Sequence, residues 1–165
     1  MGRYRPPAKP KSPYITASGY QVLNAEQDEL WKKRREVVAA LSAAAAEGDR
    51  SENAEYIYRK KQLRELDRRI RYLQKRIPEL KIVNSTPSNP EQIFFGAEVH
   101  LEDDDGNETR YRIVGPDEFD PKKNWISMDS PVARALMKKC IDDDVTVKTP
   151  GGIVSYIVID VRYEH

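Results

Sequence analysis

Two carboxylates in the first half of the chain have a spacing that could do chemistry. Asp49 and Glu52 are three residues apart, so on a helical turn both would lie on one side and could converge on a common point. Two carboxylates and several waters can hold Mg²⁺ only loosely, because this ion dehydrates reluctantly and usually relies on the phosphates of a partner. The pair could therefore complete a metal site only where another molecule supplies the remaining ligands.

The same two residues also have a purely structural interpretation. Asp49 can cap a helix, and Glu52, three residues later, would complete a capping box. Both acids also suit the positive end of the helix dipole. On sequence physics alone this interpretation is the simpler one. It leaves unexplained Glu47 and Glu55, which belong to the same acidic cluster.

A strongly basic segment follows the acids directly. From Arg59 to Arg76 there are nine Lys or Arg against two acids, Glu65 and Asp67, a net charge of +7. Any coiled coil exposes charges to water, but helical rods normally mix both signs in pairs three or four residues apart. A net charge of this size repels itself. We interpret the segment as a face that binds a polyanion, because neutralising phosphates releases counterions; a merely solvated face is the alternative.

Two helices must position these residues. Apolar residues repeat every seven positions in both, and in the second helix the spacing of three and four predicts the seam of a coiled coil. The residues are Leu23, Leu30, Val37 and Ala44 in the first, and Tyr56, Leu63, Leu66, Ile70, Leu73, Ile77 and Leu80 in the second. Because the connection is short, the helices must be antiparallel, with an acidic tip on a rod of roughly 40–45 Å.

The remaining chain divides by composition. Residues 1–14 are predicted to be a disordered, basic, Pro-rich tail, 15–82 the coiled-coil hairpin and 83–90 a linker. Residues 91–165 show the alternation of strands, with one short helix that Ser130 should cap and Pro131 should begin. Strands are expected at 93–101, 109–115, 125–129, 145–149 and 153–163. The fold class is therefore α+β: a long helical hairpin followed by a small α+β domain.

Composition limits the possible functions. The 165 residues carry a net charge of +1, but residues 1–80 carry 18 basic and 11 acidic side chains, a net of +7, and residues 81–165 carry 10 and 16, a net of −6. One cysteine, Cys140, and two histidines without ligand-spaced companions argue against a disulfide or a zinc site. Since neither a membrane span nor a secretory signal is evident, we expect a cytoplasmic protein without membrane contact.

Five segments resemble the bacterial Gre transcript cleavage factors, and the basic rod resembles the GreB type. They are "GDRSENAEY" (48–56), "KKQLRELDRRIRYL" (60–73), "YRIVG" (111–115), "ISMDSPVARALMKK" (126–139) and "VKTPGG" (147–152). They occur in the order and spacing of the family, and the likeness extends from about Ile15 to Tyr163. Several long motifs in register make this a specific resemblance.

The resemblance implies a partner and a mechanism. Gre factors bind bacterial RNA polymerase and insert their coiled coil into its secondary channel, where the 3′ end of backtracked RNA protrudes. The tip acids help to hold a second Mg²⁺ in the polymerase active centre and position a water, so that the polymerase cleaves its own RNA. We therefore expect a monomer that is not itself an enzyme and binds no cofactor tightly alone.

The resemblance also implies roles for individual residues. Asp49 and Glu52 would assist catalysis and share the metal with the polymerase, and Glu55 is a weaker supporting candidate. Four residues along the rod would hold the extruded RNA: Lys60, Lys61, Arg64 and Arg68. Arg69 and Arg71 lie on the same rod, progressively farther from the site of cleavage. Three residues of an FKBP-like domain would dock on the polymerase: Ser127, Asp129 and Pro131.

Three other functions are each compatible with part of the sequence. A basic coiled-coil arm that only grips RNA would not need the tip acids. The FKBP-like domain suggests a prolyl isomerase, but fold analogy cannot establish one. A Gre-related inhibitor would occupy the channel without promoting cleavage, and the presence of both Asp49 and Glu52 argues against it.

Overall fold

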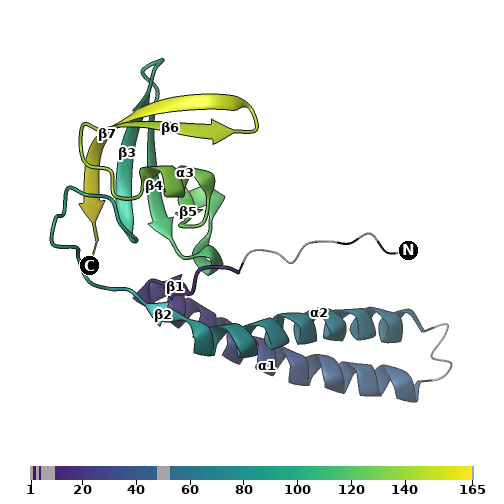
Figure 1. Cartoon of the computed structure of the whole chain (residues 1–165). Coiled ribbons are helices and arrows are strands. Elements are labelled where there is room, and N and C mark those ends of the chain that lie inside the picture. Colours follow the sequence, from purple (N-terminus) through teal and green to yellow (C-terminus); the bar gives the residue numbers. More distant parts are fainter. Residues whose placement is uncertain (1, 3, 5–9, 48–52, 165) are drawn as a thin grey trace. The chain divides into compact units, whose positions relative to one another are not determined.

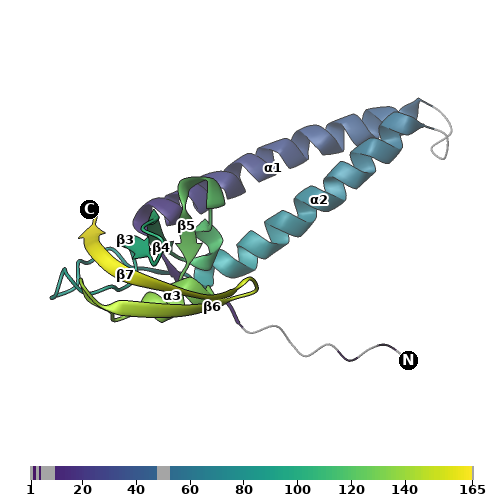
Figure 2. The ribbon, with the colours of Figure 1, turned by 90° about the horizontal axis from the view of Figure 1, so that it is seen from above.

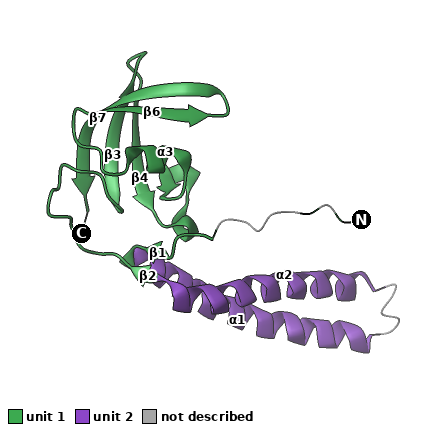
Figure 3. Ribbon diagram, viewed as in Figure 1, with its two compact units in different colours: residues 1–17, 81–165 green, residues 18–80 purple. Residues whose placement is uncertain are grey.

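The structure is a computed structural model that describes residues 2, 4, 10–47 and 53–164. It divides into two compact units (Figure 3). Residues 18–80 form a helical unit, and residues 1–17 together with 81–165 form a unit built around a sheet. The N-terminal residues therefore belong with the C-terminal half of the chain.

The helical unit is an antiparallel hairpin. Helix α1 runs over Ala17–Ala46 and helix α2 over Ala54–Arg76, and the two lie side by side in both views (Figures 1 and 2). The seam predicted from the heptads is buried, with Leu23, Val37 and Ala44 from α1 and Leu66, Ile70 and Leu73 from α2. The coiled-coil hairpin is thus confirmed, and its stability comes from packing this apolar seam.

Helix α2 ends where a proline interrupts its hydrogen bonds. Pro78 has no N–H to donate, so the α-helix stops at Arg76 and continues as a single 3₁₀ turn, η1, over Ile77–Glu79. Leu80 N donates the hydrogen bond that closes this turn to Ile77 O, at 3.2 Å.

No helix in the described part of the chain is both long and apolar enough to span a bilayer.

The sheet unit contains five main strands in the order β5-β4-β3-β7-β6 (Figure 1). Their bounds are Ala97–Asp103 for β3, Glu108–Val114 for β4, Trp125–Ser127 for β5, Asp144–Thr149 for β6 and Gly152–Tyr163 for β7. Strand β5 pairs with β4 in parallel, and the other neighbours are antiparallel. The helix α3 (Pro131–Leu136) and two 3₁₀ turns, η2 (Pro116–Glu118) and η3 (Pro121–Lys123), lie between β4 and β6 along the chain. The α+β class is confirmed.

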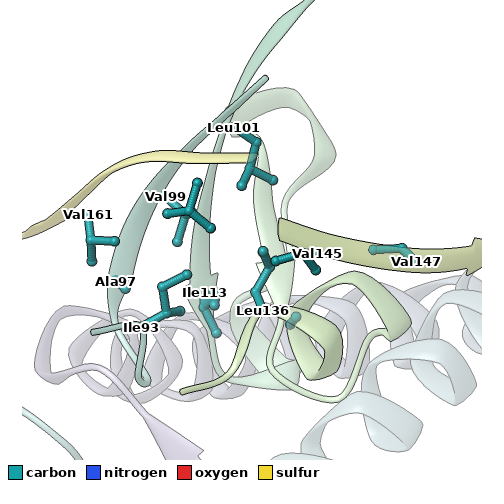
Figure 4. Packing of buried hydrophobic residues seen from close by; sticks show 11 residues of the cluster. Ile93, Ala97, Val99, Leu101, Ile113, Leu136, Val145, Val147 and Val161 are labelled. Carbon is teal, nitrogen blue, oxygen red and sulfur yellow. The ribbon is translucent and has the colours of Figure 1, made fainter. Parts of the chain in front are cut away.

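One face of this sheet is the core. Alternate residues of β3, which are Ala97, Val99 and Leu101, are fully buried and pack with residues of the other strands and of α3 (Figure 4). The cluster also contains Ile93, Ile113, Ala133, Leu136, Val145, Val147, Val158 and Val161. The opposite face, which carries the polar residues of the same alternation, is left for solvent or a partner.

The tyrosine at the end of β7 fastens the segment before β3. Tyr163 Oη accepts a hydrogen bond from Phe94 N at 2.8 Å and donates one to Gln92 O at 2.5 Å. Burial raises the pKa of Tyr163 above its ordinary value of 10, against a smaller lowering by the Phe94 bond. Tyr163 also packs against the core of the sheet unit, as Tyr111 and Tyr156 do.

The strand predictions hold apart from their ends. The first was expected from Ile93, but β3 begins at Ala97 because Gly96 has a φ of +86° and turns the chain. The third was expected to reach Asp129, but β5 ends at Ser127, since the next residues turn into α3. Ser130 caps α3 as predicted, accepting a hydrogen bond from Ala133 N at 3.3 Å.

The N-terminal segment adds a short strand that sequence analysis did not predict. Tyr14–Ile15 (β1) pairs in parallel with Lys81–Ile82 (β2), and Ile15 is fully buried. Tyr14 had been placed in the tail and Ile15 in the hairpin; in the structure both belong to the sheet unit. Gly115 explains the close fit, because a Cβ at that position would lie 2.0 Å from Tyr14 O.

Candidate functional site

The N-terminus of α2 shows which residue caps the helix at the tip. Asn53 is the N-cap: its Oδ1 accepts a hydrogen bond from Tyr56 N at 3.1 Å, and its Nδ2 donates one to Ala44 O of α1 at 2.8 Å. The capping role predicted for Asp49 with Glu52 is therefore wrong, because the helix begins at Ala54. Asp49 and Glu52 themselves lie outside the described residues.

The two bonds of Asn53 can be separated by substitution. Asn53→Ala removes both, and should speed exchange of the Tyr56 amide by roughly 5- to 30-fold, as expected for a cap worth about 1–2 kcal/mol. Asn53→Asp keeps the acceptor and loses only the donor to Ala44 O, so its effect should be smaller. Hydrogen exchange measured by NMR checks both. Equal exchange in the wild type and Asn53→Ala would contradict the assigned cap.

The described tip acids differ in their surroundings. Glu55 is in the first turn of α2, and its carboxylate forms an ion pair with Arg59 Nε at 2.8 Å, one turn further along. Glu47 is exposed just after α1. A carboxylate that already has an arginine partner is a poorer metal ligand than a free one, which is consistent with the lower rank given to Glu55.

Six basic residues of α2 form one stripe along the helix. At 100° per residue they lie within an arc of about 100°, on a side away from the seam. All six are exposed, and among the residues that the structure describes none of them forms an ion pair. This basic stripe consists of the four predicted RNA-binding residues, Lys60, Lys61, Arg64 and Arg68, with Arg71 and Lys75.

Other cations of the hairpin have a structural partner. Arg69 binds Glu26 of α1 through Nε at 2.7 Å and Nη2 at 3.0 Å, and Arg34 of α1 binds Asp67 at 2.7 Å. These pairs join the two helices. Beside the six residues of the stripe, α2 has three basic residues with ion-pair partners: Arg59, Arg69 and Arg76. Of these, Arg69, which the resemblance placed along the RNA, binds across the hairpin to α1.

A groove between the helices borders this surface. Its volume is about 350 Å³, and its lining includes Leu30 and Lys33 of α1 and Tyr58, Lys61 and Arg69 of α2. The Tyr58 ring is 59% exposed beside these cations. An exposed aromatic ring among lysines and arginines suits a single-stranded nucleic acid, because bases stack on the ring while cations meet the phosphates.

The three predicted docking residues are brought together by one turn between β5 and α3. Ser127 Oγ accepts a hydrogen bond from Asp129 N at 3.1 Å, and Ser127 O accepts one from Ser130 Oγ at 2.7 Å. Pro131 is exposed at the start of α3. The structure therefore brings Ser127, Asp129 and Pro131 together on one turn, and their docking role stays a prediction.

A further residue, which sequence reasoning missed, holds Asp129. Ser12 donates two hydrogen bonds to its carboxylate, from the backbone N at 3.0 Å and from Oγ at 2.5 Å. Nearby, Thr16 donates to the Glu118 carboxylate from its N, at 3.1 Å, and from its Oγ1. Ser12 and Asp129 are 117 residues apart, and no local pattern in the sequence signals such a contact.

Comparison with known proteins places both halves of the chain in one family. Residues 13–82 match the family model described as "Transcription elongation factor, N-terminal", and residues 87–163 match "Transcription elongation factor, GreA/GreB, C-term". The chain is 56% identical to transcription elongation factor GreB of Xanthomonas axonopodis pv. citri, over 99% of this chain and 98% of that protein. The corresponding figures for GreB of Pseudomonas aeruginosa are 54%, 99% and 98%.

Solved structures of related proteins are similar at a lower level. GreA factor homolog 1 (Gfh1) of Thermus thermophilus is 22% identical, with a TM-score of 0.42, over 90% of this chain and 97% of that one.

Proposed function

Because this chain belongs to the GreA/GreB family of transcription elongation factors, we propose that it rescues arrested bacterial RNA polymerase by stimulating cleavage of backtracked RNA. The hairpin would enter the secondary channel and bring its tip to the polymerase active centre. One observation carries this proposal: Asn53, and not Asp49 with Glu52, caps α2. The capping explanation of the acidic pair is thereby removed, which favours a role at a partner's site.

The chemical role of the tip lies in its carboxylates. Asp49 and Glu52 are hard oxygen donors of the kind that Mg²⁺ prefers, so they fit an ion shared with the polymerase. Bound there, the ion would lower the pKa of a water and stabilise charge on the scissile phosphate. Glu52 or Glu55 would orient that water or accept its proton. The isolated protein, on this proposal, is not an enzyme.

By itself, the tip has too few ligands to hold the ion. Two carboxylates, with Glu55 paired to Arg59, make an incomplete ligand set. The polymerase and its RNA would supply the rest.

The basic stripe would hold the 3′ end of the extruded RNA. Lys60, Lys61, Arg64 and Arg68 have no ion-pair partner among the described residues, so binding phosphate would break no existing pair. The net charge of −6 on residues 81–165 disfavours random nucleic-acid binding by the other half. Attraction to RNA would then concentrate along α2.

The sheet unit would dock on the polymerase through Ser127, Asp129 and Pro131. Their single turn presents an exposed proline beside a carboxylate whose orientation is fixed by Ser12. The protein would act as a monomer in the cytoplasm, where its polymerase works.

The direct test adds the purified protein to polymerase complexes stalled in a backtracked register. Shortened RNA that can be extended again is expected, and free RNA incubated with the protein alone should remain intact. An arm that only grips RNA, the second candidate, would bind the transcript and leave it uncut.

The contact between Ser12 and Asp129 makes a separate prediction about docking. Asp129→Ala should raise the concentration of factor needed for half-maximal cleavage by about 10-fold. Ser12→Ala should raise it by roughly 3- to 10-fold, because it removes the Oγ bond and keeps the bond from the backbone N, and one hydrogen bond has a net contribution of about 0.5–1.5 kcal/mol. The effect should fall on this concentration and not on the rate at saturation, because the tip is untouched.

A double-mutant cycle separates positioning from independent contacts. If Ser12 acts by orienting Asp129, Ser12→Ala should add nothing in the Asp129→Ala background. Ser12→Thr, which keeps a hydroxyl, should restore much of the affinity. Additive effects of the two substitutions would contradict the positioning role.

A further inference from the structure

Two cations lie against the ring of a tryptophan on the outer face of the sheet. Trp125 begins β5, and Arg112 lies opposite it on β4. The Arg112 guanidinium carbon is 5.1 Å from the centroid of the Trp125 ring, and Lys123 Nζ is 4.6 Å from that centroid. Both distances are those of cation–π contacts, which hold the two positive charges close to each other.

These side chains line a cavity of about 230 Å³. Its lining includes Arg110, Arg112, Lys123, Asn124 and Trp125, and we refer to it as the Trp125 pocket. Residues 81–165 contain only ten basic side chains against sixteen acidic ones, yet three of the ten line this one cavity. Such a concentration of positive charge in an acidic half of the chain is suited to an anion.

The cations of the pocket outnumber its two acids by one, and none of them is in an ion pair within the described chain. Arg110, Arg112 and Lys123 form no ion pair with any residue that the structure describes. Within the same described part, Arg112 Nε is buried and has no hydrogen-bond partner. A buried donor without an acceptor costs about 1–3 kcal/mol, a cost expected where a partner completes the site.

Two other basic side chains of the sheet have an acidic neighbour. On β7, Arg162 Nε binds Asp160 at 2.7 Å, and His100 of β3 lies 3.3 Å from the carboxylate of Glu108 on β4. Lys148 of β6 is exposed and has no ion pair among the described residues. The Trp125 pocket is therefore distinguished by its grouped cations and by the buried Arg112 Nε, and not by unpaired charge alone.

The size and the acids of the pocket limit its occupant. Glu98, opposite Arg112 on β3, and Glu164 also line it. These carboxylates would repel a chain of phosphates, whereas a single negative charge could lie between the cations. A planar guanidinium also matches the geometry of a carboxylate, with which it can form two parallel hydrogen bonds.

The position of the pocket indicates where this carboxylate comes from. Trp125 and Ser127 are two residues apart on β5, so their side chains lie on the same face of the strand. Ser127 belongs to the proposed docking turn. We propose that the Trp125 pocket binds the carboxylate of an Asp or Glu on the RNA polymerase surface, an inference that rests on the proposed docking function. The pocket extends the docking surface along β5.

The test measures affinity for core RNA polymerase by competition, with the full chain. Lys123→Glu should weaken binding by about 10-fold through repulsion of the carboxylate, and Lys123→Gln by less. Lys148→Glu makes the same change at an exposed lysine of β6, outside the pocket, and should stay within about 2-fold of the wild type. Equal effects of Lys123→Glu and Lys148→Glu would overturn the proposal.

A second measurement observes the pocket itself. In a Trp31→Phe variant labelled with 5-fluorotryptophan, Trp125 gives the only ¹⁹F signal, because the chain has two tryptophans. This signal should shift when polymerase is added, and should not shift with single-stranded RNA or millimolar inorganic phosphate. A shift caused by RNA or by phosphate would overturn the assignment of a protein carboxylate.

The outcomes also distinguish a failure of the pocket proposal from a failure of the docking function on which it rests. If Asp129→Ala weakens polymerase binding while Lys123→Glu does not, the docking turn stands and the Trp125 pocket is wrong. If the wild-type protein does not bind polymerase at all, the proposed function itself fails.

Discussion

Replacing Asp49 with Asn and Glu52 with Gln should lower the rate of RNA cleavage in backtracked polymerase complexes by about 100-fold or more. This is the range expected when a group that positions a reacting water or its proton is lost. Both substitutions keep the size of the side chain and remove only its charge. The measurement is the rate of transcript shortening in stalled complexes at saturating factor, so that weaker binding cannot imitate a loss of chemistry.

Two controls make this result specific. Glu47→Gln removes one negative charge from the exposed end of α1 and should leave cleavage near the wild-type rate. The single variant Asp49→Asn should need more Mg²⁺ for half-maximal cleavage, because one ligand of a weakly held ion is missing. Cleavage at the normal rate by the double variant would show that the acids do not deliver a metal, and would favour an arm that only binds RNA.

Removing two charges from the basic stripe should weaken rescue most for complexes with a long extruded RNA. Lys60→Ala together with Lys61→Ala deletes two phosphate contacts, and for single-stranded nucleic acid each contact contributes about 0.7 to the slope of log affinity against log salt. The slope should therefore become shallower by roughly 1.4. Half-saturating factor concentrations measured over a series of salt concentrations provide this slope.

The control for the stripe lies on the other helix. Lys32→Ala with Arg35→Ala also removes two positive charges, but from exposed positions of α1, and Lys32 is already paired with Glu29 at 3.3 Å. This variant should keep the wild-type slope. An unchanged slope in the Lys60 and Lys61 variant would mean that these lysines do not meet RNA, and the assignment of the stripe would be wrong.

Local signals account for what could be predicted of the fold. The heptad positions located the seam because a period of seven repeats over several turns, and Leu66, Ile70 and Leu73 are indeed buried. Ser130 and Pro131 marked the start of α3, because a cap and a first-turn proline affect only the turn of helix that follows them. Strand ends were less accurate, because a single glycine such as Gly96 can delay a strand that the alternation already suggests.

Contacts between distant parts of the chain could not be predicted. Asp49 was a reasonable cap on local grounds, but Asn53 is favoured because it also reaches Ala44 across the hairpin. Likewise, Ser12 lies beside Asp129 because the segment that contains it pairs, through β1, with β2 after the second helix. The Trp125 pocket brings together residues of β3, β4, η3 and β5, and none of them is unusual in its own stretch of sequence.

Strand β1 has a practical consequence for dissecting this protein. A fragment that starts after residue 82 would contain all five main strands and α3, and would look like a complete domain by sequence. It would nevertheless lack Ile15, whose side chain is fully buried, and the hydroxyl groups that meet Asp129 and Glu118. Truncations of this kind would underestimate the affinity of the C-terminal half for polymerase, whereas restoring residues 10–17 together with Lys81 and Ile82 of β2 should recover it.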